Sequence, residues 1–459
     1  MTNFWDSNIW GILNLVAVLL ASLLLANGLK KRIKFFQKSL IPTSVLGGII
    51  LLIIAMIYNV ISDKAFFDSA FFGGNGYATL ETIAYHALAW GFIAATLKST
   101  NNKITKQRNT EVFNTGLTTV STYLLQAVVG LVITIVASFI LTDFFPVAGL
   151  LLPFGYGQGT GQALNYGNIY ETDFGFVGGK SFGLTIAAFG FLSASIGGVI
   201  HLHAIKKKNP VLFERLNEKH EQKTTMIGED GKDGSLGKLT VQIALISIAY
   251  LLTYGIMLLL GYLIPSMKSV IFGFNFLFGV LSAILLKCVL KLFKKKNVIK
   301  SEVTNNYLLS NVSNFSYDLM IVAGIAAIRL DTISIYLGIL LILGIVGAII
   351  TYVYNRFVAK KLFPDYHEQQ FLAMYGMLTG TASTGIVLLR EIDPDFTSPA
   401  SDNLVYQNLP AILFGFPIML LATFAPKEPY ITLAILAVMF FLMNVLLFRS
   451  KIFRRKKKQ

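Results

Sequence analysis

The chain has 459 residues, of which 54% are apolar and only 14% are charged. Soluble globular domains carry about 25% charged residues, so this composition excludes that class and is typical of a polytopic membrane protein. The net charge is +15, and the basic residues lie in short runs between apolar segments. This pattern is typical of loops that orient a membrane protein and does not indicate a nucleic-acid partner. The single cysteine, Cys288, excludes an internal disulfide framework.

Eleven apolar segments approach or exceed the roughly 20 residues that a helix needs to cross the hydrocarbon core of a bilayer. Five of them precede a hydrophilic stretch at 206–239, and six follow it. In chain order they are 9–27, 40–60, 80–97, 117–144, 181–205, 240–264, 270–290, 307–330, 334–355, 404–426 and 430–448. The sequence therefore predicts an all-α membrane protein that lies in the lipid bilayer.

The basic residues predict its orientation. If the N-terminus lies outside, the cytoplasmic segments carry 34 of the 39 lysines and arginines, as the positive-inside rule requires. The opposite orientation would place this basic load outside. We expect an external N-terminus and a cytoplasmic C-terminus.

Five spans reverse the direction of the chain, so the second half begins inside and repeats the first half upside down. We predict two inverted-topology repeats of five transmembrane helices, each with a re-entrant hairpin, and an extra C-terminal helix. The predicted domains are 1–205 for the first repeat, 206–239 for a cytoplasmic linker, 240–426 for the second repeat, and 427–459 for the extra helix and a basic tail.

The first hairpin is predicted near 153–170, where the sequence reads PFGYGQGTGQALNYGNIY. Its alternating glycines, at 155, 157, 159 and 161, are poor in helices and in strands, yet apolar sequence leads directly into them. Irregular backbone at membrane depth is tolerated where protein or a water-filled cavity covers it. We predict a hairpin whose backbone amides and polar side chains face a ligand. The alternative is a glycine-rich loop outside the membrane.

A second glycine-rich segment occupies the matching position of the second half, near 372–389, where MYGMLTGTASTGI begins at Met374. Two such interrupted segments in inverted halves indicate the binding site of a transporter. The predicted substrate-binding residues are Gly157, Gln158, Gly159, Thr160, Gly161, Gln162, Thr379, Gly380, Thr381, Ser383 and Thr384.

The span at 307–330 carries Tyr307, Asn311, Asn314 and Asp318, whose spacing places them on one helical face. A carboxylate inside a membrane is costly and is by default a functional hypothesis; the alternative is a structural aspartate at a helix contact. Amides can coordinate a metal ion but cannot titrate. This face therefore favours Na+ over H+ as the coupling ion.

Two histidines, His201 and His203, lie close to the predicted cytoplasmic interface. Residues two apart on a helix do not face one metal ion, so we assign neither a role.

These features resemble the bacterial glutamate:sodium symporter family over about residues 9–426. The resemblance rests on Ile41-Pro42 with Gly47-Gly48, on GYGQGTGQA at 155–163, where Gln158 replaces a histidine of the family motif, and on Asn311-Val312-Ser313. The second motif departs from the family at Leu378 and Ser383. The resemblance implies glutamate uptake with Na+, a homodimer in the bacterial cytoplasmic membrane, and a mobile core that carries both hairpins. With the polar face, it gives a predicted sodium site of Asn311, Ser313, Asn314 and Asp318.

We therefore expect a sodium-coupled symporter that imports glutamate or a similar small carboxylate, with no catalytic residues and no organic cofactor. A membrane-embedded enzyme acting on a lipid is the alternative, but no cluster of catalytic or metal-binding motifs supports it. A passive channel is disfavoured because a pore usually needs a ring of equivalent elements.

Overall fold

The computed structural model describes residues 4–38, 40–98, 106–208, 237–296, 303–393 and 397–452. Most of the predicted linker at 206–239 and the end of the basic tail lie outside these residues. Throughout the described part the chain is helical and contains no strand, as the composition predicts.

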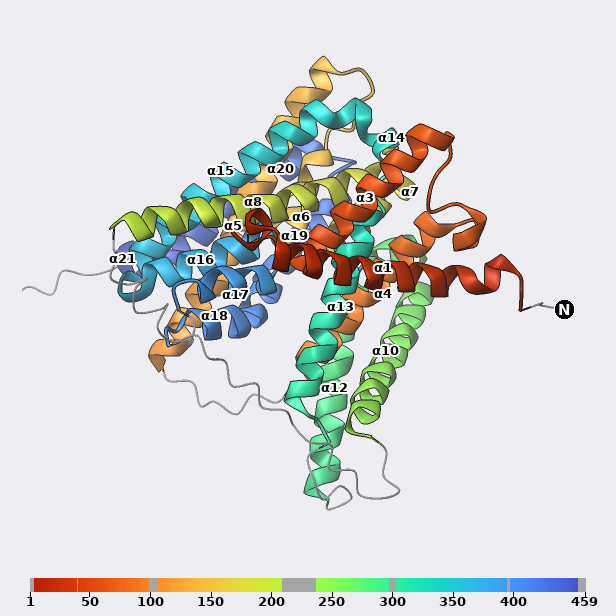
Figure 1. The fold of residues 1–459 in the computed structure, drawn as a ribbon. Helices are drawn as coiled ribbons and strands as arrows, with labels where there is room; N and C mark the ends of the chain where they lie inside the picture. The colour runs from red at the N-terminus through yellow and green to blue at the C-terminus, as the bar shows by residue number, and fades with distance from the viewer. Residues whose placement is uncertain are drawn as a thin grey trace, which may run out of the picture. The chain divides into compact units, whose positions relative to one another are not determined.

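The longer helices follow the predicted apolar segments in order (Figure 1). They are α1 (Ser7–Arg32), α3 (Thr43–Ser62), α4 (Gly76–Leu97), α5 (Lys106–Ile140), α6 (Leu151–Gln158), α7 (Thr160–Phe174), α8 (Gly179–Lys208), α10 (Lys238–Leu263), α12 (Asn275–Lys295), α13 (Asn306–Ala326), α15 (Leu337–Leu362), α16 (His367–Thr379), α17 (Ala382–Arg390), α18 (Ala400–Tyr406), α19 (Asn408–Phe424) and α20 (Pro429–Leu447). The short helices are α2 (Lys34–Lys38), α11 (Lys268–Gly273), α14 (Leu330–Ile333) and α21 (Arg449–Ile452).

Among the described residues, eight helices are long and apolar enough to cross a membrane. These contain α1, α3, α5, α8, α10, α12, α15 and α20. The other three predicted spans, α4, α13 and α19, are also helical, but α19 is short and α4 and α13 carry more polar residues. The chain is therefore a multi-pass membrane protein.

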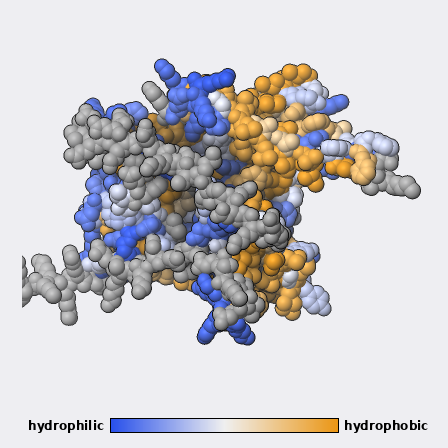
Figure 2. All heavy atoms as spheres, turned by 60° about the horizontal axis from the view of Figure 1, so that its bottom comes forward, coloured by the Kyte–Doolittle hydropathy of each residue, from blue (hydrophilic) through white to orange (hydrophobic). Residues whose placement is uncertain are grey.

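Many large apolar side chains lie on the outside. Along α10, for example, Leu251, Leu259 and Leu263 are each more than half exposed. Figure 2 shows apolar side chains over a broad part of one face and hydrophilic ones in separate clusters. Soluble monomers rarely expose apolar patches of this size, whereas lipid tails cover them.

The chain forms two compact units. The first contains residues 1–20, 67–103 and 220–323, and the second contains 21–66, 104–219 and 324–459. In the first unit, α4, α10, α12 and the start of α13 share a core of small and branched side chains, among them Ile93, Leu245, Ala249 and Leu309.

The second unit holds both glycine-rich segments and the helices packed around them, α5, α8 and α15. Small residues let these helices approach closely, which is a common device in membranes. A Cβ on Gly190 of α8 would lie 2.5 Å from the carbonyl oxygen of Thr379 and 3.2 Å from the Cα of Tyr156. One glycine of α8 therefore touches both segments.

Candidate substrate and ion site

The first glycine-rich segment folds as two short helices, α6 and α7, that meet at Gly159. Gly159 has φ +80° and ψ −172°, a combination that is essentially restricted to glycine. The ring of Phe154, before the break, stacks on that of Tyr166, after it, with centroids 3.8 Å apart. The two helices therefore fold back on each other as a helical hairpin.

The prediction that the alternating glycines cannot form a helix is wrong. Gly155 and Gly157 lie inside α6, and Gly161 lies inside α7. Packing explains this, because a Cβ on Gly157 would lie 2.1 Å from the ring of Tyr123, and one on Gly155 would lie 2.7 Å from Ile186. The hydroxyl of Tyr123 also donates to the carbonyl of Gly157 over 3.0 Å. Close packing thus offsets the cost of about 1 kcal/mol that each glycine adds to a helix.

Two tyrosines fix α7 to α19. The hydroxyl of Tyr166 donates to the carbonyl of Met419 (2.9 Å), and that of Tyr170 donates to the carbonyl of Ala422 (2.8 Å). Both side chains are buried. Sequence analysis did not single out these anchors.

The second glycine-rich segment is also a helical hairpin, formed by α16 and α17, which are joined at Gly380 and Thr381. A Cβ on Gly376 would lie 2.7 Å from the Cα of Gly385, so the two helices touch at these glycines. The Thr381 hydroxyl caps α17 by accepting from the backbone N–H of Thr384 at 3.4 Å. The chain reverses at Gly380 and Thr381, within the segment 372–389.

The tips of the two hairpins meet. A Cβ on Gly159 would lie 3.5 Å from Cγ2 of Thr381 and 3.7 Å from the carbonyl oxygen of Gly380. Two helices, α7 and α17, begin at this point, and two others, α6 and α16, end there. The meeting point thus combines helix N-termini, which favour anions, with helix C-termini, whose carbonyls favour cations.

Gln162, in the first turn of α7, is the most informative side chain near the tips. It is only 2% exposed, and neither its Nε2 nor its Oε1 has a hydrogen-bond partner among the described residues. A buried polar group without a partner costs about 1–3 kcal/mol. An amide with one free donor group and one free acceptor suits a ligand that the protein binds here.

The other predicted substrate-binding residues lie at or next to the tips. Thr379 and Thr384 are buried, and the hydroxyl of Thr379 donates to the carbonyl of Tyr375. The side chain of Ser383 lies outside the described part of the chain. The remaining ones are buried or half-buried: Gly157, Gln158, Gly159, Thr160, Gly161, Gly380 and Thr381.

The predicted sodium ligands lie on α13, in the first unit. Asn311, Asn314 and Asp318 are exposed along one face, as their spacing predicts. Ser313 lies on a different face, since it is buried and its hydroxyl donates to the carbonyl of Gly91 over 3.0 Å. No group of three or more His, Cys, Asp or Glu side chains suited to a metal ion occurs in the described ranges, so any cation site there relies largely on neutral oxygens.

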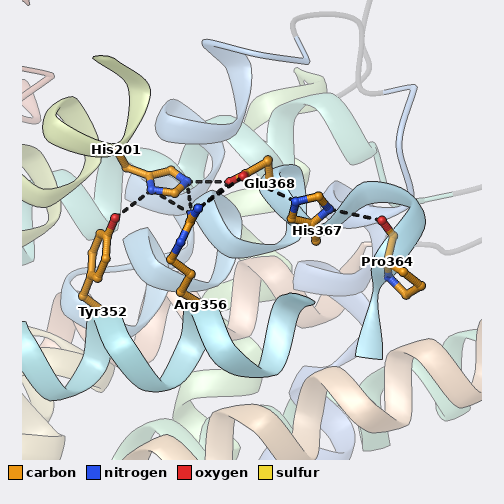
Figure 3. A network of polar contacts seen from close by, with 6 residues as sticks. All are labelled: His201, Tyr352, Arg356, Pro364, His367 and Glu368. Atoms are coloured by element: carbon orange, nitrogen blue, oxygen red, sulfur yellow. Dashed lines mark hydrogen bonds and ion pairs between the residues drawn. The ribbon is translucent and has the colours of Figure 1, made fainter. Parts of the chain in front are cut away.

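A charged network ties the foot of the second hairpin to α8 and α15 (Figure 3). Glu368, at the start of α16, accepts a hydrogen bond of 2.6 Å from Nε2 of His201 and one of 3.2 Å from Arg356. Tyr352 completes the network, because its hydroxyl lies 2.8 Å from Nδ1 of His201. His201 is 1% exposed and thus has a structural role that sequence analysis missed, because its partners lie far away in the sequence.

The network changes the acidity of Glu368. Burial alone would raise the pKa of its carboxyl, but the hydrogen bonds and charges of His201 and Arg356 outweigh burial and lower this pKa to about 2. An acid with a lowered folded pKa stabilises the fold above its unfolded pKa and loses that contribution as the pH falls through the folded value.

We therefore expect Glu368→Gln to lower the free energy of unfolding at pH 7 by about 1–2 kcal/mol, between the values for exposed and buried pairs. The difference between wild type and variant should shrink as the pH falls from about 4.5 towards 2. Thermal unfolding of the purified wild type and variant at several pH values measures this difference in stability. Glu428→Gln, at an exposed position, is the control. A difference that stays constant down to pH 2 would contradict this account of Glu368.

A family model described as "Sodium/glutamate symporter" matches residues 9–392, which run from α1 to the end of α17 and include both hairpins. A search of curated proteins found no match.

Proposed function

Because the chain belongs to the sodium/glutamate symporter family, we propose that it imports glutamate or a similar small carboxylate together with Na+. The family consists of transporters and not of enzymes, and its coupling ion is Na+. With the apolar helices, this membership makes the chain a sodium-coupled, multi-pass membrane transporter. The substrate and the residues that bind it are the proposal.

The observation that carries the proposal is the meeting of the hairpin tips beside the unpartnered amide of Gln162. A dicarboxylate needs two anion-binding groups, and two helix N-termini begin at the tips, those of α7 and α17. The first backbone N–H groups of a helix have no partner within the helix, and together with the helix dipole they suit carboxylates without a buried cationic side chain. We propose that Gln162 hydrogen-bonds to the substrate between them.

We further propose that both helical hairpins are re-entrant and enter the membrane from opposite sides. The supporting observations are the matching order of helices around them and the contact of their tips. In this arrangement residues 1–205 and 240–426 form inverted repeats, 206–239 links them in the cytoplasm, and 427–459 adds a helix and a tail. The proposed setting is a homodimer in a bacterial cytoplasmic membrane with the N-terminus outside.

For the coupling ion we propose Asn311, Asn314 and Asp318 of α13 as ligands, with Ser313 as a weaker candidate because it is buried on a different face of the helix. Moving one negative charge into the cell against a membrane potential of about 100 mV costs about 2.3 kcal/mol. One Na+ that moves with a monoanionic substrate only cancels this charge. Uptake that is driven by the membrane potential therefore needs at least two cations for each monoanionic substrate, which favours more than one Na+ site.

The test is uptake of radiolabelled glutamate into proteoliposomes. We expect uptake with an inward Na+ gradient and none when choline replaces Na+. Equal uptake in choline, driven by an imposed pH gradient, would show that the coupling ion is the proton. Uptake inhibited equally well by unrelated neutral amino acids would show that the substrate is wrong.

In the same assay, Asp318→Asn should raise the Na+ concentration for half-maximal uptake at least tenfold, which corresponds to about 1.4 kcal/mol of lost ion binding. The substitution keeps the size of the side chain but removes its charge. Asp331→Asn, on α14, is the matched control. An unchanged Na+ dependence in Asp318→Asn would remove this residue from the sodium site.

A further inference from the structure

Four polar side chains form a buried group between α5 and α15 in the second unit. Thr122 and Gln126 are one helical turn apart on α5, and Thr351 and Asn355 are one turn apart on α15. Each is at most 1% exposed. We refer to these four residues as the α5–α15 quartet.

The side-chain donors of Gln126, Asn355 and Thr122 are engaged inside the protein. Nε2 of Gln126 donates to Oγ1 of Thr351 (2.8 Å) and to the carbonyl of Leu378 (3.1 Å). Nδ2 of Asn355 donates to the carbonyl of Thr351 (2.9 Å) and to Oγ1 of Thr122 (3.3 Å). The hydroxyl hydrogen of Thr122 is directed at the carbonyl of Thr118.

Within the described part of the chain, the side-chain atoms of the quartet that remain without a partner are amide oxygens. Oε1 of Gln126 and Oδ1 of Asn355 are buried and have no hydrogen-bond partner among the described residues. Both α5 and α15 belong to candidate membrane spans, where polar groups must find partners within the protein. A site whose amide donors are used and whose unpartnered amide oxygens are neutral suits a cation.

We propose that Gln126 and Asn355 are oxygen ligands of a second Na+ site, between α5 and α15. Hard cations prefer such oxygens, and the quartet contains no carboxylate to compensate the dehydration of a divalent ion. The inference rests on the proposed function, because sodium-coupled uptake of an anion is driven by the membrane potential only when a second cation moves with it.

The site lies beside the second hairpin. Gln126 binds the carbonyl of Leu378, two residues before the break at Gly380. A cation held by Oε1 fixes the orientation of this amide and therefore also its hydrogen bond to the hairpin. Occupation of the site is thereby linked to the conformation of the tip.

The test measures Na+ binding without substrate, as the shift of the thermal unfolding midpoint of the purified full chain. NaCl replaces choline chloride at constant ionic strength. An Asp318→Asn background weakens the other proposed sodium site. In this background Asn355→Leu should raise the Na+ concentration for half-maximal stabilisation at least tenfold.

Asn403→Leu is the matched control. Asn403 is 0% exposed, and its Nδ2 donates to Tyr366 and to Gln370. Its Oδ1 also lacks a partner within the part of the chain that the structure describes, but Asn403 is not part of the quartet. This variant should lower the unfolding midpoint without changing the Na+ dependence. Equal changes of the Na+ dependence in both variants would overturn the site.

A second variant, Asn355→Asp, retains an oxygen and adds a charge, so at pH 8 it should need at least tenfold less Na+ than the parent protein. If Asn355→Leu and Asn355→Asp both keep the Na+ dependence of their parent while glutamate uptake remains sodium-dependent, only this inference fails. If the two variants change the Na+ dependence as predicted but the wild-type protein takes up no glutamate, the cation site is supported and the proposed substrate is wrong.

Discussion

The Gly159→Val variant is expected to lose glutamate uptake completely while it still folds in the membrane. With φ +80° and ψ −172°, Gly159 has a backbone conformation that costs any other residue about 1–3 kcal/mol. Its Cβ position lies 3.5 Å from Cγ2 of Thr381, so the methyl groups of valine extend into the tip of the other hairpin. Uptake by proteoliposomes and the amount of folded protein in the membrane measure the two effects.

Gly175→Ala is the matched control. Gly175 also has a positive φ, +72°, but it ends α7 at the far end from the tip, and no heavy atom lies within 4 Å of its Cβ position. We expect a loss of about 1 kcal/mol in stability and normal uptake. If Gly159→Val transports like Gly175→Ala, the meeting of the tips has no part in transport.

The Gln162→Met variant should separate binding from stability. Methionine is unbranched and similar in length, so it fills the same space without the amide. The amide atoms have no partner among the described residues, so their removal should leave the stability unchanged or raise it. Glutamate affinity should fall roughly 10- to 100-fold, since a hydrogen bond to a charged group contributes about 1.5–3 kcal/mol. Calorimetric binding and thermal unfolding of one preparation give both values.

Gln370→Met is the matched control and should lower the stability without changing the affinity for glutamate. Gln370 is 1% exposed, its Nε2 donates to Thr115 (3.1 Å), and its Oε1 accepts from Asn403 (3.1 Å). Its replacement leaves partners unsatisfied and should lower the free energy of unfolding by about 1–3 kcal/mol, with glutamate affinity retained. If instead Gln162→Met is the destabilised variant and binds glutamate normally, the amide of Gln162 is structural.

The sequence predicted the helical class, the order of the helices and the two glycine-rich segments in which the chain breaks. These properties are local, since apolar segments of a certain length become helices in a membrane, and Gly159 and Gly380 mark the breaks. The assignment of irregular backbone to Gly155, Gly157 and Gly161 was wrong, because helix propensity describes an isolated helix. It does not include the contact of Gly157 with Tyr123.

The residues that sequence analysis missed depend on contacts between distant segments. His201 meets Glu368 167 residues later, and Gln126 meets Thr351 225 residues later. No spacing rule within one helix predicts such pairs. The spacing of His201 and His203 within one helix carried no information on Glu368, the carboxylate that binds His201.

The central claim is that glutamate binds where the hairpin tips meet, and substrate protection of a cysteine tests it most directly. Ala382 is exposed and is the first residue of α17, next to Thr381. In a Cys288→Ser background, N-ethylmaleimide should label Ala382→Cys, and glutamate with Na+ should slow the reaction at least tenfold. Thr172→Cys, at the other end of α7, should react at the same rate with and without glutamate. Labelling of Ala382→Cys that saturating glutamate does not slow, in protein that still takes up glutamate, would contradict the account.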